Sequence, residues 1–187
     1  MKDITGLILA GGRGERMGGV DKGWAIHERR PLIVTVVERF APQVGHLLIS
    51  ANRNVERYGM LGTVVEDISI GGDRFAGPLI GVLSGLRQAR TEWVAIVPCD
   101  APRLPLDLVQ RLVSAVLNAG ATAACARVND QLQPTFTLVK TDSAPDLASA
   151  IAAGTRAMHR WLESIGVVAV DFDDTTAFAN INHIVTE

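Results

Sequence analysis

A glycine- and arginine-rich loop close to the N-terminus carries the residues best suited to chemistry. Five glycines lie between positions 11 and 19, together with Arg13, Arg16 and, a little further on, Lys22. Glycines let backbone N–H groups approach an anion closely, and the cationic side chains neutralise its charge. The apolar run of residues 6–10 in front of the loop is typical of a buried strand. The pattern therefore predicts a polyphosphate cradle at the end of a strand.

The loop fits neither of the two commonest phosphate-binding patterns. A Walker loop needs a lysine followed by Ser or Thr, whereas Lys22 is followed by Gly23. A dinucleotide fingerprint needs a third glycine three positions after the second, where this chain has Met17. Lys22 is instead expected to reach the phosphates as a point charge. The structural alternative is an ordinary strand-to-helix turn that carries a solvated lysine.

Asp100 is the leading candidate for a metal ligand. It follows the most apolar predicted strand, residues 93–97, and lies between Pro98 and Pro102. Magnesium takes one or two protein carboxylates and completes its shell with phosphate and water. A helix-capping or turn aspartate is the alternative. The phosphate loop favours Mg²⁺ on Asp100.

Two further strand ends add polar groups to the same expected edge, because ligands of open α/β sheets bind beyond the carboxyl ends of strands. The predicted strand at 46–51 is followed by Asn52, and the one at 63–66 by Asp67. Both side chains could contact a nucleobase or ribose, and both are also common turn residues.

No histidine spacing suits a metal, and no strained nucleophile motif occurs. This profile favours phosphoryl or nucleotidyl transfer without a covalent nucleophile.

The order of apolar segments predicts an α/β fold with a mostly parallel sheet that is covered on both faces. Strands and helices alternate through the first 120 residues, and a polar turn then separates two strands that predict a hairpin. The helices are predicted at 31–40, 79–89, 105–119, 144–153 and 157–165, and the later strands at 121–128, 135–140 and 167–172.

Composition limits the classes of function. The 187 residues fit one domain, and 48% hydrophobic with 20% charged residues is typical of a globular protein. A formal net charge of −2 argues against a nucleic-acid partner, and no apolar run is long enough for a membrane span. Cys99 and Cys125 are interpreted as reduced, buried thiols, and no signal-peptide pattern precedes the first strand. We therefore expect a cytoplasmic protein.

The chain resembles the nucleotidyltransferases that activate sugars and cofactors, and within them the MobA family of molybdenum cofactor guanylyltransferases. Residues 9–18 are similar to the signature L-A-G-G-x(n)-R-M-G of the superfamily, and residues 19–23 narrow the resemblance to the MobA branch. The resemblance covers nearly the whole chain in preserved order. Its other matches lie at 50–53, 66–67, 77–81, 98–102, 133–134, 154–156 with Trp161 and Leu162, and 180–182.

This resemblance implies a Rossmann-like, three-layer α/β/α fold in one domain, 1–187, of the nucleotide-diphospho-sugar transferase type. The part up to about residue 120 would bind the nucleotide, and residues 121–187 the acceptor. The implied reaction transfers GMP from GTP to the terminal phosphate of molybdopterin, with or without molybdenum, and releases pyrophosphate with the help of Mg²⁺. Transient contacts with other cofactor-biosynthesis proteins or target molybdoenzymes would follow.

The resemblance also implies the residues of the site. Lys22, Asp100 and Arg16 would be catalytic, with Asp100 as the Mg²⁺ ligand. Ser50 stands where many family members carry an asparagine, so the nucleoside contact there is expected to differ or to pass to Asn52. GTP would lie against Leu9, Ala10, Gly11, Gly12, Lys22, Ser50, Asn52, Asp67 and Asp100, and the acceptor against Gln133, Arg156, Asn180 and Asn182.

Two alternatives remain open at this point. A sister nucleotidyltransferase would use CTP or activate a sugar phosphate. Measurement of pyrophosphate release with different nucleotides distinguishes it from a guanylyltransferase. A GTP-binding regulator without chemistry would release no pyrophosphate with any acceptor.

Overall fold

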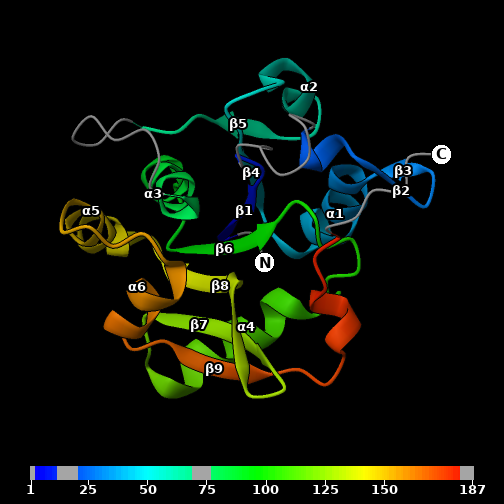
Figure 1. Cartoon of the computed structure of the whole chain (residues 1–187). Helices are drawn as coiled ribbons and strands as arrows, with labels where there is room; N and C mark the ends of the chain where they lie inside the picture. Colours follow the sequence, from blue (N-terminus) through cyan, green and yellow to red (C-terminus); the bar gives the residue numbers. More distant parts are fainter. Residues whose placement is uncertain (1–2, 12–20, 69–76, 182–187) are drawn as a thin grey trace.

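The computed structural model describes residues 3–11, 21–68 and 77–181. Its core is a seven-stranded sheet in the order β5-β4-β1-β6-β8-β7-β9 (Figure 1). Only β8 runs against its neighbours, since its pairs with β6 and β7 are antiparallel and the other pairs are parallel. The predicted mostly parallel sheet and the hairpin are both confirmed. The strands are β1 (Ile4–Leu9), β4 (His46–Ser50), β5 (Thr63–Val65), β6 (Trp93–Pro98), β7 (Ala123–Val128), β8 (Gln131–Lys140) and β9 (Val168–Asp171).

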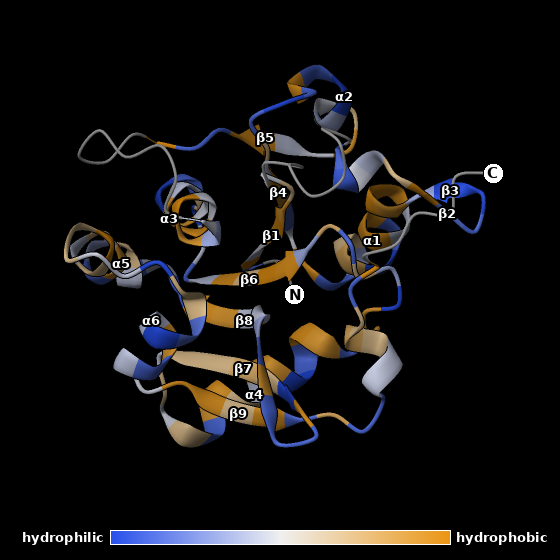
Figure 2. Ribbon diagram, in the orientation of Figure 1, coloured by the Kyte–Doolittle hydropathy of each residue, from blue (hydrophilic) through white to orange (hydrophobic). Residues whose placement is uncertain are grey.

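Helices cover both faces of this sheet, as the predicted three-layer fold requires. One hydrophobic core joins α1 and α4 to one face, and a second joins α3, α5 and α6 to the other. Strand β1 serves both, because Ile4 and Ile8 belong to the first core and Leu7 to the second. Figure 2 shows hydrophobic colours concentrated in the central strands. The helices are α1 (Leu32–Phe40), α2 (Val55–Gly59), α3 (Pro78–Gln88), α4 (Leu108–Ala119), α5 (Ala144–Ala152) and α6 (Met158–Ser164).

The four strands β5, β4, β1 and β6 end side by side. Leu9 at the end of β1 is in register with Ser50 of β4 and Pro98 of β6, and Ser50 is in register with Val65 of β5. The hydrogen-bond ladder continues past the strands, from Ala10 N to Ser50 O at 2.8 Å and from Cys99 N to Leu9 O at 3.1 Å. The residues that follow these strands are therefore held at one edge, called the rim below.

Some predicted boundaries were wrong for identifiable reasons. Helix α4 begins at Leu108 rather than Pro105, because the buried Gln43 amide ties down the preceding turn. Gln43 Nε2 donates to Pro105 O and Gln43 Oε1 accepts from Val109 N, at 2.9 and 3.0 Å. Pro31 lies just before α1 as its capping residue, not inside its first turn.

Two elements near the rim were not predicted from the sequence. One is α2, and the other is the hairpin of β2 (Ile26–His27) and β3 (Arg30–Pro31). The two turn residues of the hairpin, Glu28 and Arg29, both have positive φ without being glycine, asparagine or aspartate, so the usual sequence signal is missing. In the described part of the chain, no helix combines the length and apolarity that crossing a membrane requires.

Gly85 tests the packing of α3 on β1. A Cβ on Gly85 would lie 2.5 and 2.8 Å from the two Cδ atoms of the buried Leu7. We expect Gly85→Ala to lower the free energy of unfolding by about 1–3 kcal/mol in urea titrations, because overpacking strains a dense core. Gly59→Ala in α2 is the matched control, since no atom lies within 4 Å of the added Cβ. Equal stabilities of the two variants would contradict the packing.

Candidate functional site

Lys22 and Asp100 meet at the rim as an ion pair. Asp100 follows β6 and is only 5% exposed, and Lys22 Nζ contacts its Oδ2. The backbone of Asp100 is held as well, because Ile181 N donates to its carbonyl at 2.9 Å. Burial of a carboxylate is costly without a partner, and Lys22 supplies that partner. The side chain of Lys22 is 29% exposed beside this carboxylate, so its ammonium group is suited to neutralise the charge of phosphates at the rim.

The segment of Lys22 is fixed by its neighbour Asp21. Asp21 Oδ1 accepts from the Tyr58 hydroxyl at 2.5 Å and from Gly23 N at 3.2 Å, and Asp21 Oδ2 accepts from Asn54 Nδ2 at 2.8 Å. The 3₁₀ helix Lys22–Trp24 starts at this cap. Sequence reasoning missed Tyr58 and Asn54, since both belong to the unpredicted α2 and its cap. The Asp21-Lys22-Gly23 motif was the one signal that pointed to this place.

Asn52 and Asp67 form a second polar pair on the rim. Asn52 Nδ2 donates to Asp67 Oδ2 at 2.7 Å, and Asp67 N donates to Asn52 Oδ1 at 2.9 Å. Helix α3 supports the pair, because Ile68 N donates to the buried Ser84 hydroxyl at 3.0 Å. The two predicted nucleoside-binding side chains thus hold each other in place.

Ser50 and Gly11 complete this part of the rim. A Cβ on Gly11 would lie 3.3 Å from Asn52 Nδ2 and 3.5 Å from Ser50 Oγ, so the loop backbone passes directly over both side chains. Gly81 of α3 approaches from the other side, and a Cβ there would collide with the Ser50 hydroxyl. Ser50 is 1% exposed. It therefore acts as a packed support beneath the loop more than as an open binding group.

Burial shifts the acid–base properties of three groups at the rim. Burial raises the pKa of Asp67, and the Asn52 amide and Ser50 hydroxyl offset part of that increase. The other oxygen of Asp67, Oδ1, is buried and has no hydrogen-bond partner within the described ranges. Burial also raises the pKa of Tyr58 and of the Cys99 thiol. Cys99 thus remains a protonated thiol, which agrees with a site that has no cysteine nucleophile.

The predicted acceptor-side residues come from three separate segments. Asn180 directly precedes Ile181 and is thereby brought to Asp100. Gln133 lies in the part of β8 that extends beyond the last position paired with β6, where Thr137 of β8 is in register with Ile96 of β6. Arg156 lies between α5 and α6, where its guanidinium donates to the Ile151 and Thr155 carbonyls at 2.9 and 3.1 Å. Gly12, Arg16 and Asn182 lie outside the described residues.

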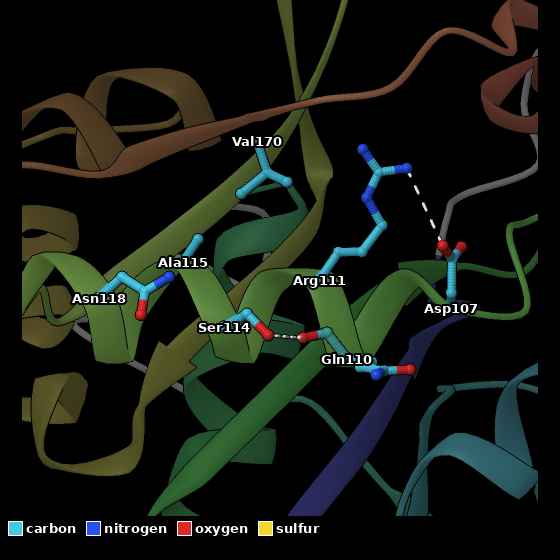
Figure 3. Close-up of a pocket in the computed structure, with 7 residues that line it drawn as sticks. All are labelled: Asp107, Gln110, Arg111, Ser114, Ala115, Asn118 and Val170. Carbon is cyan, nitrogen blue, oxygen red and sulfur yellow. Dashed lines mark hydrogen bonds and ion pairs between the residues drawn. The ribbon is translucent and has the colours of Figure 1, made fainter.

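A cavity of about 440 Å³ lies away from the rim, along the outer face of α4 and beside Val170 of β9 (Figure 3). Its charged side chains bind one another or the fold. Arg111 pairs with Asp107 at 3.9 Å, donates to Asp171 O and stacks over the Phe172 ring. None of the site residues that were predicted from the sequence lines this cavity, so the rim remains the candidate site.

The donor set of the rim fits a magnesium ion with few protein ligands. Across residues 3–11, 21–68 and 77–181, no three His, Cys, Asp or Glu side chains gather closely enough to hold a metal ion. Magnesium needs only one or two carboxylates when phosphates and water complete its shell. Asp100, an oxygen donor at a strand end, suits that role.

Solved structures of other proteins share the fold of this chain. The chain has the fold of a molybdopterin-guanine dinucleotide biosynthesis protein A from Archaeoglobus fulgidus, with a TM-score of 0.76 at 22% identity over 95% of this chain and 92% of the other. A Mycobacterium tuberculosis protein solved in complex with manganese has a TM-score of 0.61 at 16% identity, over 92% of this chain and 89% of the other. The chain therefore shares the fold of these two proteins.

The family follows from sequence. The profile of the MobA-like NTP transferase domain matches residues 6–169. A molybdenum cofactor guanylyltransferase of Ralstonia nicotianae is 44% identical over 189 aligned positions, covering 96% of this chain and 92% of the relative. This chain belongs to the MobA-like NTP transferase family, and it is an enzyme of the nucleotidyltransferase type. The resemblance in the sequence motifs is thereby confirmed.

The raised pKa of Asp67 gives a pH-dependent stability prediction. A carboxyl group whose pKa is higher in the folded than in the unfolded protein stabilises the folded state at a pH below both pKa values. This contribution is lost as the pH rises from the unfolded-state pKa through the folded-state pKa. Asp67→Asn removes this contribution. The free energy of unfolding of the variant minus that of the wild type should therefore be more positive at pH 7 than at pH 4.

Urea unfolding at the two pH values measures this difference. Asp173→Asn is the control for the loss of a carboxylate charge, since Asp173 is exposed and lies beyond β9. A pH-independent difference for Asp67→Asn would show that burial leaves this carboxyl group unperturbed.

Proposed function

We propose that this chain transfers GMP from GTP to the terminal phosphate of molybdopterin, either molybdenum-bound or free, and releases pyrophosphate. The observation that carries the proposal is the Lys22–Asp100 pair at the rim of a MobA-like fold. The high identity to a molybdenum cofactor guanylyltransferase over 96% of the chain supports the choice of substrates.

The chemistry needs positioning and charge neutralisation. An oxygen of the molybdopterin phosphate attacks the α-phosphorus of GTP in line, and the bond to the bridging oxygen of the β-phosphate breaks. Lys22 Nζ neutralises charge on the phosphates and on the departing pyrophosphate. Asp100 would hold Mg²⁺, which supplies positive charge to phosphate oxygens. From the resemblance, Arg16 and Gly12 would add to the phosphate site.

The nucleoside would lie along the Asn52–Asp67 side of the rim. Asp67 Oδ1 is a buried acceptor without a partner in the described structure, so a nucleoside N–H or O–H group would satisfy it. The backbone at Leu9, Ala10 and Gly11 passes over Ser50 and Asn52 and would form the opposite wall. These contacts support the proposal that the part of the chain up to about residue 120 binds the nucleotide.

The acceptor would occupy the side of Asp100 that faces the C-terminal part, residues 121–187. The bond from Ile181 N to Asp100 O supports a role of the neighbouring Asn180 in binding the acceptor. Gln133, Arg156 and Asn182 join this surface on the strength of the resemblance. The same proposal includes transient docking to cofactor-biosynthesis proteins or target molybdoenzymes. It also includes a cytoplasmic location, which suits the free thiols of Cys99 and Cys125.

Removal of the Asp100 carboxylate tests the metal assignment. We expect Asp100→Ala to lower kcat on the order of 100-fold or more, because the carboxylate that would hold Mg²⁺ beside the reacting phosphates is lost. The free energy of unfolding should change far less, because Lys22 is 29% exposed and can turn to solvent. Steady-state kinetics at several Mg²⁺ concentrations and urea titrations measure both. Asp107→Ala, at the residue just before α4, is the control. Undiminished Mg²⁺-dependent turnover of Asp100→Ala would refute the assignment.

The choice of nucleotide is tested by pyrophosphate release with GTP, CTP, ATP and UTP in the presence of molybdopterin. We expect GTP to give the highest kcat/KM by at least about tenfold, since a site built to hydrogen-bond one base leaves its polar groups unpaired with another. A preference for CTP would identify the sister activity. Binding of GTP without pyrophosphate release would identify a regulator.

A further inference from the structure

Asp21 stands next to Lys22 but cannot share its role at the phosphates. Both of its carboxylate oxygens already accept hydrogen bonds from the protein, from Tyr58, Gly23 and Asn54. Those three bonds come from the segment itself and from α2 with its cap, so Asp21 ties the segment to a neighbouring element. A carboxylate with this set of donors is an anchor and not a second metal ligand.

The contact with α2 is close and specific. Tyr58 is fully buried, and a Cβ on Gly23 would collide with its hydroxyl oxygen. Trp24 packs against the Tyr58 ring at 5.2 Å, and Arg57 stacks over Trp24 at 3.7 Å. Because burial raises the pKa of Tyr58, its hydroxyl stays protonated and keeps donating to Asp21. The residues on both sides of Lys22 are thus immobilised against one helix.

Asp21 and Asp100 flank Lys22 from opposite segments. Lys22 pairs with Asp100 on the side of β6. Its backbone is bounded on the other side by the Asp21 cap. The ammonium group is therefore presented from a fixed base toward the rim.

We propose that Asp21 is a positioning residue, which aims Lys22 at Asp100 and the substrate phosphates through its bonds to Tyr58, Asn54 and Gly23. The role of Lys22 at the phosphates rests on the proposed function, whereas the aiming of Lys22 at Asp100 does not. Without the anchor, Lys22 would keep its charge but lose its fixed direction. Misplacement of a catalytic group by about 1 Å can cost on the order of 100-fold in rate.

The test is a double-mutant cycle with Asp21→Asn and Lys22→Ala. In the wild-type background, we expect Asp21→Asn to lower kcat about 10- to 100-fold with a small change in KM for GTP. In the Lys22→Ala background, the same change should alter the residual rate by no more than about twofold, because its effect passes through Lys22. Tyr58→Phe, which removes one of the three donors, should show a smaller loss of the same kind.

A second readout needs no substrate. The ¹H–¹⁵Nζ cross peak of Lys22, visible when an ammonium group is held in a stable ion pair, should be present in the wild type and lost in Asp21→Asn. Asp173→Asn is the matched control for both readouts, and thermal unfolding reports whether each variant folds.

The outcomes separate the two proposals. An unchanged Lys22 cross peak in folded Asp21→Asn, or equal rate losses in both backgrounds, would overturn the positioning role. A wild-type enzyme that releases no pyrophosphate with GTP and molybdopterin would instead refute the proposed function, and the cross peak would still decide the role of Asp21.

Discussion

The ion pair between Lys22 and Asp100 ties the N-terminal segment to the middle of the sheet. Asp100 is nearly buried at the end of β6, where an ionised carboxylate without a partner would be costly. Lys22 offsets that cost from a segment far away in sequence, and it remains partly exposed to solvent. The pair therefore combines a carboxylate that is nearly buried in the fold with an ammonium group that remains accessible to a ligand.

The parallel register makes such a pair possible. Leu9, Ser50 and Pro98 lie side by side at the ends of β1, β4 and β6, so short continuations of each strand must meet. Small residues then allow close approach, as Gly11 does over Asn52 and Gly81 does beside Ser50. The rim is thus a consequence of strand direction and residue size, before any charge is considered.

Much of this arrangement could be predicted from the sequence, because long apolar runs identify β1, β4 and β6 and the polar residues that follow them. Asp100, Asn52 and Asp67 lie on the rim for that reason. The anchor of Lys22 could not be predicted, since α2 has only five residues and owes its place to the burial of Tyr58 against Gly23. Such a tertiary contact leaves no periodic signal in the sequence. The roles of Gly12, Arg16 and Asn182 stay predictions, because these residues lie outside the described structure.

Asp100 and Asp67 on the rim are in opposite electrostatic situations. Asp100 has a cation beside it, whereas the partners of Asp67 include the neutral amide of Asn52. Burial raises the pKa of Asp67, and its Oδ1 has no hydrogen-bond partner in the described residues. An acceptor in that state is best satisfied by a neutral N–H or O–H donor, since a phosphate would add repulsion. In the proposed function, polarity would thus divide the rim, with phosphate charge drawn toward Lys22 and nucleoside donors toward Asp67.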